Sequence, residues 1–142
     1  MRAKPQEASQ ALFAARKVLD ATSGGLKRHL EKLSSSAEAF LAKRRTYAYS
    51  LAATCAAGYV VGLGDRHLDN FLLDLSTGNV IGIDFGHAFG SATYLLPVPE
   101  VVGVRLTRQL TSFLRPLDTN VLLKRHMVVT LDALRLRRSD LM

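Results

Sequence analysis

The 142-residue sequence contains a single cysteine, Cys55, and no tryptophan. One thiol cannot close an intramolecular disulfide, so a disulfide framework is excluded and a reducing compartment is indicated. Long apolar segments are lacking as well, because the longest run, from Leu51 to Gly64, is too short and too rich in glycine to span a bilayer. With 48% hydrophobic residues, the chain is instead expected to fold as one globular domain around a core of its own.

The charge of the chain, a net +7, is distributed unevenly. Residues 1–50 hold ten Lys and Arg against four acids, residues 101–142 hold eight against three, and residues 51–100 hold one Arg against five acids. A basic protein is a candidate for nucleic-acid binding. Here the basic residues are not interleaved with aromatic ones, so we interpret the flanks as solvated helix faces and expect any direct nucleic-acid binding to be weak. The acids of the middle segment suit a cation-binding centre.

Helical patterns occupy both ends of the chain. They predict helices over residues 6–20, 26–33, 35 to about 57, 106–114 and 118–137. The long helix is expected to begin at a capping box formed by Ser35 and Glu38 and to end at Gly58, and Asp118 is expected to cap the last helix. The apolar stripe of the long helix predicts four buried residues, which are Phe40, Tyr47, Leu51 and Thr54.

The middle of the chain changes to short apolar runs that are typical of strands. Residues 71–75 and 80–84 flank the turn sequence Ser76-Thr77-Gly78-Asn79, so the pattern predicts a β-hairpin. A hairpin brings its two ends side by side, so Asn70 at its entrance and Asp84 at its exit are expected to be neighbours. From residue 86 to about 106 the chain contains Gly and Pro without a clear period, which predicts a long functional loop.

Two polar clusters lie at the ends of this hairpin: Gly64-Asp65-Arg66-His67-Leu68-Asp69-Asn70 and Ile83-Asp84-Phe85-Gly86. Asp65 precedes Asn70 by five residues, which is the Asp-to-Asn spacing of the protein-kinase catalytic loop, and the second cluster contains Asp-Phe-Gly. Phosphoryl transfer from ATP needs a residue that accepts the substrate hydroxyl proton and hard oxygen ligands for magnesium. Asp65 suits the first task, and Asp84 with Asn70 suits the second.

The triplet Asp65-Arg66-His67 reverses the His-Arg-Asp order of ordinary protein kinases. This reversal, together with Gly62-Leu63-Gly64 before it, resembles the phosphatidylinositol 3-kinase superfamily and its large branch of related protein kinases. Within that branch, residues 82–93, 96–100 and 105–109 look like the DNA-dependent protein kinases. The resemblance is close over residues 58–110 and looser over 26–57 and 133–140.

The resemblance implies an α+β fold, the mainly helical large lobe of a protein-kinase-like domain with a small β-hairpin at its catalytic centre. It divides the chain into helices before the catalytic loop (1–57), the catalytic loop (58–70), the hairpin (71–84), an activation loop (86–107) and following helices (108–142). A glycine-rich loop, a strand lysine and its partner glutamate are not identifiable before residue 58. We therefore expect a piece of a larger kinase that lacks the small lobe and that alone is inactive and prone to aggregation.

The resemblance also implies roles for individual residues. Asp65 would orient and deprotonate a substrate hydroxyl, and His67 would share that work, either as a base or as a cation near the γ-phosphate. Magnesium, or manganese in its place, would be held by Asn70 and Asp84. The residues on the adenine side of ATP would be Leu72 and Ile83.

The segment after Asp84-Phe85-Gly86 bears on substrate class. Lipid kinases of the superfamily place lysines there to hold inositol phosphates, whereas this chain has no Lys or Arg between Gly86 and Arg105. The apolar residues 94–98 indicate a protein Ser/Thr substrate instead. The resemblance further implies repair of DNA double-strand breaks by non-homologous end joining, assembly with the Ku heterodimer and DNA ends, a nuclear location and no membrane contact.

Other interpretations remain open at this level. The chain is alternatively a non-catalytic pseudokinase or scaffold module, a lipid-kinase segment or a DNA-binding module. His67 is alternatively a hydrogen-bonded structural residue, and Arg66 is expected either to pair with a structural carboxylate or to touch substrate. Asp69 is expected to be merely exposed, His87 to support the loop, and Cys55 to be a small buried residue.

Overall fold

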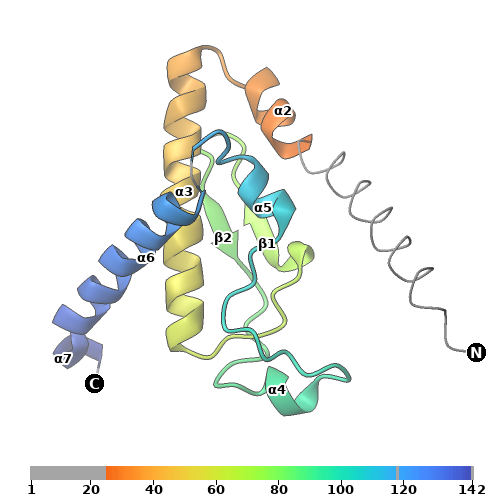
Figure 1. The fold of residues 1–142 in the computed structure, drawn as a ribbon, viewed down its shortest axis with the longest axis vertical. Coiled ribbons are helices and arrows are strands. Elements are labelled where there is room, and N and C mark those ends of the chain that lie inside the picture. Colours follow the sequence, from red (N-terminus) through yellow and green to blue (C-terminus); the bar gives the residue numbers. More distant parts are fainter. Residues whose placement is uncertain (1–24, 118, 142) are drawn as a thin grey trace, which may run out of the picture.

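The structure is a computed structural model that describes residues 25–117 and 119–141. Its elements, in chain order, are α2 (Gly25–Lys32), α3 (Ala37–Val60), the 3₁₀ turn η1 (Leu68–Asn70), β1 (Phe71–Leu73), β2 (Val80–Gly82), α4 (Ala92–Leu95), α5 (Arg108–Ser112), α6 (Thr119–Leu136) and α7 (Arg138–Leu141). The long helix α3 stands at the centre, with the β1–β2 hairpin on one side and α6 on another (Figure 1). A mainly helical fold with one small sheet confirms the α+β class.

Both ends of α3 differ from the prediction by a few residues. The N-cap is Ser36, not Ser35, because its side-chain oxygen accepts a hydrogen bond from the Ala39 amide at 3.1 Å. At the other end, the helix runs through Gly58 and stops at Val60, so the first residues of the expected catalytic loop are helical. The stop is a Schellman motif in which Gly62, at φ +59°, takes the left-handed position.

Hydrogen bonds complete this motif. The Leu63 amide donates to Gly58 O at 2.8 Å and the Gly62 amide donates to Tyr59 O at 3.2 Å, which satisfies carbonyls that the helix end leaves free. A Cβ added at Gly58 would lie 3.7 Å from Leu63 Cβ, which is an ordinary van der Waals distance, so packing does not require glycine there. The glycine that ends α3 is therefore Gly62, and the prediction of Gly58 is wrong.

The other predicted elements are confirmed in part. The helix expected over residues 26–33 is α2, and the helix expected over 106–114 shortens to α5, which Thr107 caps by accepting from the Leu110 amide at 3.3 Å. The loop expected from residue 86 to 106 is interrupted by the single turn α4. The helix predicted over residues 6–20 and the cap predicted at Asp118 lie outside the described residues.

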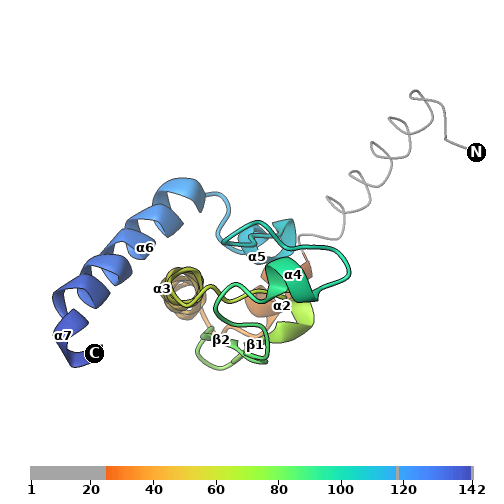
Figure 2. The ribbon, with the colours of Figure 1, turned by 90° about the horizontal axis from the view of Figure 1, so that it is seen from below.

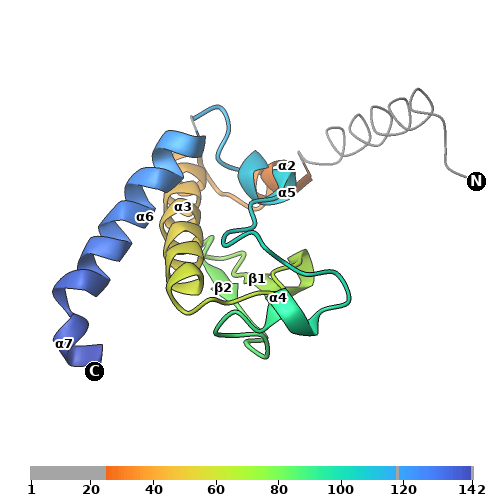
Figure 3. The same cartoon turned by 60° about the horizontal axis from the view of Figure 1, so that its bottom comes forward.

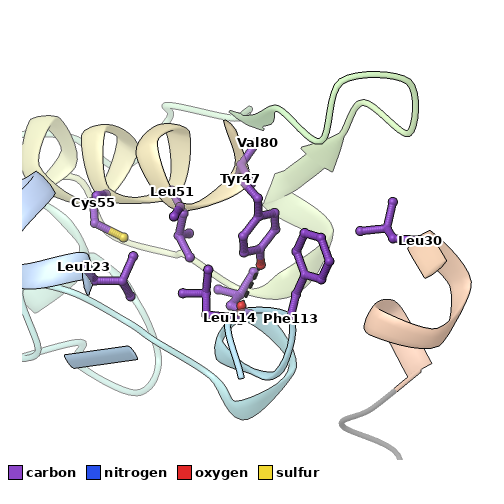
Figure 4. Packing of buried hydrophobic residues seen from close by; sticks show 11 residues of the cluster. Leu30, Tyr47, Leu51, Cys55, Val80, Phe113, Leu114 and Leu123 are labelled. Carbon is purple, nitrogen blue, oxygen red and sulfur yellow. Dashed lines mark hydrogen bonds between the residues drawn. The ribbon is translucent and has the colours of Figure 1, made fainter. Parts of the chain in front are cut away.

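The core lies between α3 and the segment around α5 (Figure 4). Tyr47 of α3 packs edge-on against Phe113, with ring centroids 5.0 Å apart, and its hydroxyl donates to Leu110 O at 2.7 Å. Burial raises the pKa of the Tyr47 phenol. Of the four stripe residues, Tyr47 and Leu51 are fully buried as predicted, whereas the other two, Phe40 and Thr54, are only half-buried.

The hairpin packs on α3 through β2 (Figure 2). The strands are antiparallel, with Phe71 opposite Gly82 and Leu73 opposite Val80, and the Val80 amide donates to the Ser50 hydroxyl of α3 at 2.9 Å. A helix side chain thus satisfies a strand donor that has no partner in the two-stranded sheet.

The connection between the strands is longer than the predicted four residues and begins at Asp74. The Asp74 carboxylate accepts from the Ser76 amide and hydroxyl at 2.8 and 2.6 Å and from the Thr77 hydroxyl at 2.6 Å. The side-chain hydrogen bonds from Ser76 and Thr77 lower the pKa of Asp74 to about 2. This carboxylate belongs to the turn, which explains why the strands end at Leu73 and begin at Val80.

Replacement of Gly78 is expected to weaken the hairpin's attachment to α3. Its φ is +80°, and a Cβ there would lie 2.5 Å from Lys43 O, so Gly78→Ala adds a steric collision to a strained backbone. Gly90→Ala is the matched control, because Gly90 has φ +78° and open space around it. We expect a cost of about 2–4 kcal/mol for Gly78→Ala and about 1–2 kcal/mol for Gly90→Ala. Hydrogen exchange of residues 71–82 in the full-length protein measures the cost of Gly78→Ala. Equal protection of these residues in the two variants would contradict the expected difference.

Cys55 of α3 belongs to the buried hydrophobic cluster, which Leu123 of α6 also joins, and α3 and α6 lie beside each other in Figure 3. It is 9% exposed, as expected of a small buried residue, and burial raises the pKa of its thiol to about 11. Because the thiolate is the reactive species, alkylation at pH 8 is expected to be about a hundredfold slower than at an exposed cysteine. Peptide-level mass spectrometry after iodoacetamide treatment measures this, with Ser139→Cys on α7 as the exposed reference. Equal labelling of both thiols would refute the expectation.

No helix in the described part of the chain is both long enough and apolar enough to cross a membrane.

Candidate active site

The loop after α3 lies against the segment that follows Asp-Phe-Gly. The Gly64 amide donates to His87 O, the Phe89 amide donates to Val61 O, and the Gly90 amide donates to Gly62 O, each at 2.8 Å. Glycine is required for this approach, because a Cβ on Gly62 would lie 2.8 Å from the Gly90 nitrogen. Main-chain hydrogen bonds thus join the chain segments next to the two polar clusters, and His87 supports the loop through its carbonyl.

Arg66 is the buried centre of the site, with 8% of its surface exposed. Its guanidinium donates to Gly64 O at 2.9 Å, to Ile83 O at 2.8 Å and to Asp84 O, and it lies 5.7 Å from the centroid of the Phe85 ring. Among the described residues its hydrogen-bond partners are carbonyls, and not the structural carboxylate that one of the two expectations named. A planar group with five donors can bridge two chain segments in this way, and Arg66 holds the two clusters together.

Asn70 is also buried, at 5% exposure, and its orientation is set by its own cluster. The side-chain nitrogen donates to Asp65 O at 2.7 Å, which turns the amide oxygen away from that carbonyl. The Asn70 carbonyl accepts from the Ile83 amide at 3.0 Å, so the two ends of the hairpin meet as predicted and Asp84 follows directly.

Two aspartates of the site adopt the left-handed backbone conformation. Asp65 has φ +57° and Asp84 has φ +56°, a region that Asp and Asn tolerate better than most residues with a side chain. The Asp84 carboxylate accepts from the Gly86 amide at 3.2 Å through Oδ1 only. Such conformations cost free energy and occur most often at functional sites.

His67 lies between two carboxylates. Its Nε2 is 4.0 Å from Asp65 Oδ2 and its Nδ1 is 3.8 Å from Asp69 Oδ2, which are ion-pair distances rather than hydrogen bonds. Among the residues that the structure describes, the buried Nδ1 has no hydrogen-bond partner, which disfavours the hydrogen-bonded structural interpretation. The Asp69 side chain is 98% exposed, as expected, although it also contributes charge beside His67.

One face of the hairpin presents apolar side chains to solvent. Leu72 of β1 pairs with Ile81 of β2, and they are 51% and 47% exposed. Ile83 lies two residues beyond Ile81 and therefore on the same face, where it is half-buried. The sequence singled out Leu72 and Ile83 but missed Ile81, which the alternation of apolar residues along β2 could have identified.

Glu100 is the second residue of the site that sequence reasoning missed. Its Oε2 accepts a hydrogen bond from the Asp65 amide, although 35 residues separate the two in the chain. A groove beside Asp65 is lined by Glu100 and by apolar side chains of the same loop, which include Leu96, Val98, Val101, Val102 and Leu106. No local signal marks such a contact, because any residue supplies an amide hydrogen except proline.

Metal binding in this site depends on few protein ligands. Within residues 25–117 and 119–141, no group of three or more His, Cys, Asp and Glu gathers as a cage for a metal ion. Magnesium at phosphate-transfer sites needs only one or two protein ligands, since phosphates and waters supply the rest. The Asp84 carboxylate, with one oxygen committed to Gly86, and the amide oxygen of Asn70 fit that requirement chemically.

The chain is similar in sequence and in structure to known kinases. The sequence model of the family described as phosphatidylinositol 3- and 4-kinase matches residues 2–142. The chain is 54% identical over 110 residues to the DNA-dependent protein kinase catalytic subunit of Dictyostelium discoideum and 53% identical to that of Mus musculus, covering 78% of this chain and 3% of each relative. It is similar to a solved structure of the FAT and kinase domain of CtTel1, with a TM-score of 0.71 and 36% identity, covering 80% of this chain and 8% of that one.

Proposed function

The chain belongs to the phosphatidylinositol 3- and 4-kinase family, and from that premise we propose that it carries the catalytic loop and metal ligands of a protein serine/threonine kinase. The chain spans about 3% of the length of the curated relatives it matches, so the activity is that of the full-length protein. The observation that carries the proposal is the hairpin, whose two ends bring Asn70 and Asp84 together beside Asp65.

Magnesium, when bound, would supply positive charge that offsets the negative charge on the phosphates during transfer. Asn70 and Asp84 are the residues that would hold it. The hydrogen bond from the Asn70 nitrogen to Asp65 O keeps the amide oxygen available as a ligand, and Arg66 fixes the backbone of Asp84 through its carbonyl. The protein thus orders the ligands before the ion binds, which reduces the cost of binding.

Asp65 orients the hydroxyl of the substrate and accepts its proton. The Asp65 backbone is held at both of its polar ends, since its amide donates to Glu100 and its carbonyl accepts from Asn70. His67 shares this work, as a base or as a cation near the γ-phosphate, from a position 4.0 Å from the Asp65 carboxylate. Fixed geometry of this kind supplies much of the rate in phosphoryl transfer.

The adenine of ATP stacks on the exposed apolar face of the hairpin. Leu72, Ile81 and Ile83 share that face, and burial of their exposed surface under a nucleobase is favourable. This proposal explains why two large apolar side chains of a short hairpin, Leu72 and Ile81, remain about half exposed in the described part of the chain.

The substrate class is proposed to be protein rather than lipid. Relatives from Dictyostelium and mouse carry protein kinase in their names, and no Lys or Arg lies between Gly86 and Arg105 to hold an inositol phosphate. Incubation of the purified full-length protein with ATP and either a mixed protein substrate or phosphatidylinositol vesicles tests this. We expect phosphoserine and phosphothreonine in the protein and no labelled lipid. Labelled lipid without labelled protein would reverse the proposal.

The cellular setting is proposed from the same relatives. Their name states a dependence on DNA. From the resemblance to this group of kinases, we propose that the full-length protein acts at DNA ends together with the Ku heterodimer, in double-strand-break repair by non-homologous end joining in the nucleus. We propose that the 142-residue chain alone is inactive, because no glycine-rich loop or strand lysine precedes residue 58 in its sequence.

A further inference from the structure

Glu100 makes a contact that the chemistry described so far does not use. Its carboxylate oxygen Oε2 accepts the amide hydrogen of Asp65. Asp65 has φ +57° and belongs to no helix or strand, so no secondary-structure ladder supplies a partner for this amide. A hydrogen bond to an ionised acceptor is among the stronger ones in proteins. The contact therefore fixes the backbone of the residue that is proposed to orient the substrate.

The surroundings of Glu100 favour this contact. Its own amide donates to Ala92 O at 3.3 Å, which fixes the backbone of Glu100 to the first residue of α4. Gly64 leaves the space that the Ala92 side chain occupies, because a Cβ on Gly64 would collide with that side chain, and it brings Ala92 and Glu100 close to the Asp65 amide. Gly64, Ala92 of α4 and Glu100 are thus arranged around the hydrogen bond from the Asp65 amide to Glu100.

Glu100 also belongs to the wall of the groove beside Asp65. Its neighbours in the loop, Val98 and Val101, are 79% and 82% exposed, so they offer apolar surface to a peptide that enters the groove. A peptide that contacts these residues presses on the same short segment that holds the Asp65 amide. Order in the loop is thereby coupled to the position of the Asp65 backbone.

We propose that Glu100 is a positioning residue. When a bound peptide orders the loop of residues 96–106, Glu100 transmits that order to Asp65 through its hydrogen bond to the Asp65 main-chain amide. This inference rests on the proposed protein kinase function. The test compares Glu100→Ala and Glu100→Gln with the wild-type full-length protein, with kcat and KM measured separately for ATP and for a peptide substrate. Asp132→Asn on the exposed face of α6 is the matched control for loss of one acidic charge.

We expect Glu100→Ala to lower kcat by about 10- to 100-fold with the KM for ATP changed less than about twofold, because misplacement of a catalytic group mainly affects the chemical step. Glu100→Gln keeps a carbonyl acceptor in the same place and is expected to recover kcat to within about threefold. A kcat for Glu100→Ala within twofold of wild type would overturn the inference, as would a Gln variant as slow as the Ala variant. If the wild-type protein does not phosphorylate protein substrates, the proposed function is wrong, and the inference that rests on it fails as well.

Discussion

Asp84→Ala in the full-length protein is expected to reduce protein phosphorylation by at least about a thousandfold. The carboxylate is the one charged ligand in the proposed magnesium pair, and loss of charge stabilisation at a phosphoryl-transfer site has effects of this size. The steady-state rate of phosphate transfer to a peptide, at saturating ATP and magnesium, measures the effect. A small loss would mean that Asp84 is not a metal ligand.

The companion variant Asp84→Asn separates charge from backbone conformation. Asn tolerates φ near +56° about as well as Asp, and its amide oxygen still accepts from the Gly86 amide. It is therefore expected to fold as the wild type does and to be nearly as inactive as Asp84→Ala. Asp132→Asn, on the exposed face of α6, changes the same charge away from the site and is expected to keep full activity. Near-wild-type activity of Asp84→Asn would contradict a charge-based role.

Arg66→Lys is expected to lower phosphorylation by at least about a hundredfold although it keeps the positive charge. An ammonium group on a flexible stem cannot donate to Gly64 O, Ile83 O and Asp84 O at once, as the planar guanidinium does. The two polar clusters would then shift relative to each other, and a displacement of about 1 Å can cost about a hundredfold in rate. Peptide phosphorylation and hydrogen exchange over residues 64–70 and 83–86 together measure the change.

Arg66→Ala extends this prediction to stability. It leaves three carbonyls without their charged donor in a mostly buried site, at a cost of about 2–4 kcal/mol in local stability, whereas Arg66→Lys should cost less. The two variants are thus expected to differ in amide protection but to share the loss of activity. Arg135→Lys and Arg135→Ala, at an exposed position near the end of α6, are the matched controls and should change neither. Activity of Arg66→Lys within a fewfold of wild type would refute the claim that Arg66 holds the two polar clusters together.

Local sequence signals predicted the parts of the fold that depend on near neighbours in the chain. The apolar runs around Ser76-Thr77-Gly78-Asn79 predicted the hairpin, and the hairpin predicted that Asn70 and Asp84 meet. The errors are displacements of a few residues at element ends and the short helix α4, which lies inside the predicted loop. Gly58 and Gly62 carry the same residue-type signal for a helix stop, and only the left-handed backbone at Gly62 distinguishes them.

The sequence by itself determined the family of this protein, its α+β class and the polar residues gathered at the hairpin, because spacing along the chain and side-chain type carry that information. Tertiary structure alone decided what holds those residues in place: the carbonyl partners of Arg66, the Asp65 amide bonded by Glu100, and the approach of Gly62 to Gly90. The physical reason is that these contacts involve main-chain atoms. Every residue has a carbonyl and nearly every residue has an amide, so such partners leave no mark in the sequence until the chain is folded.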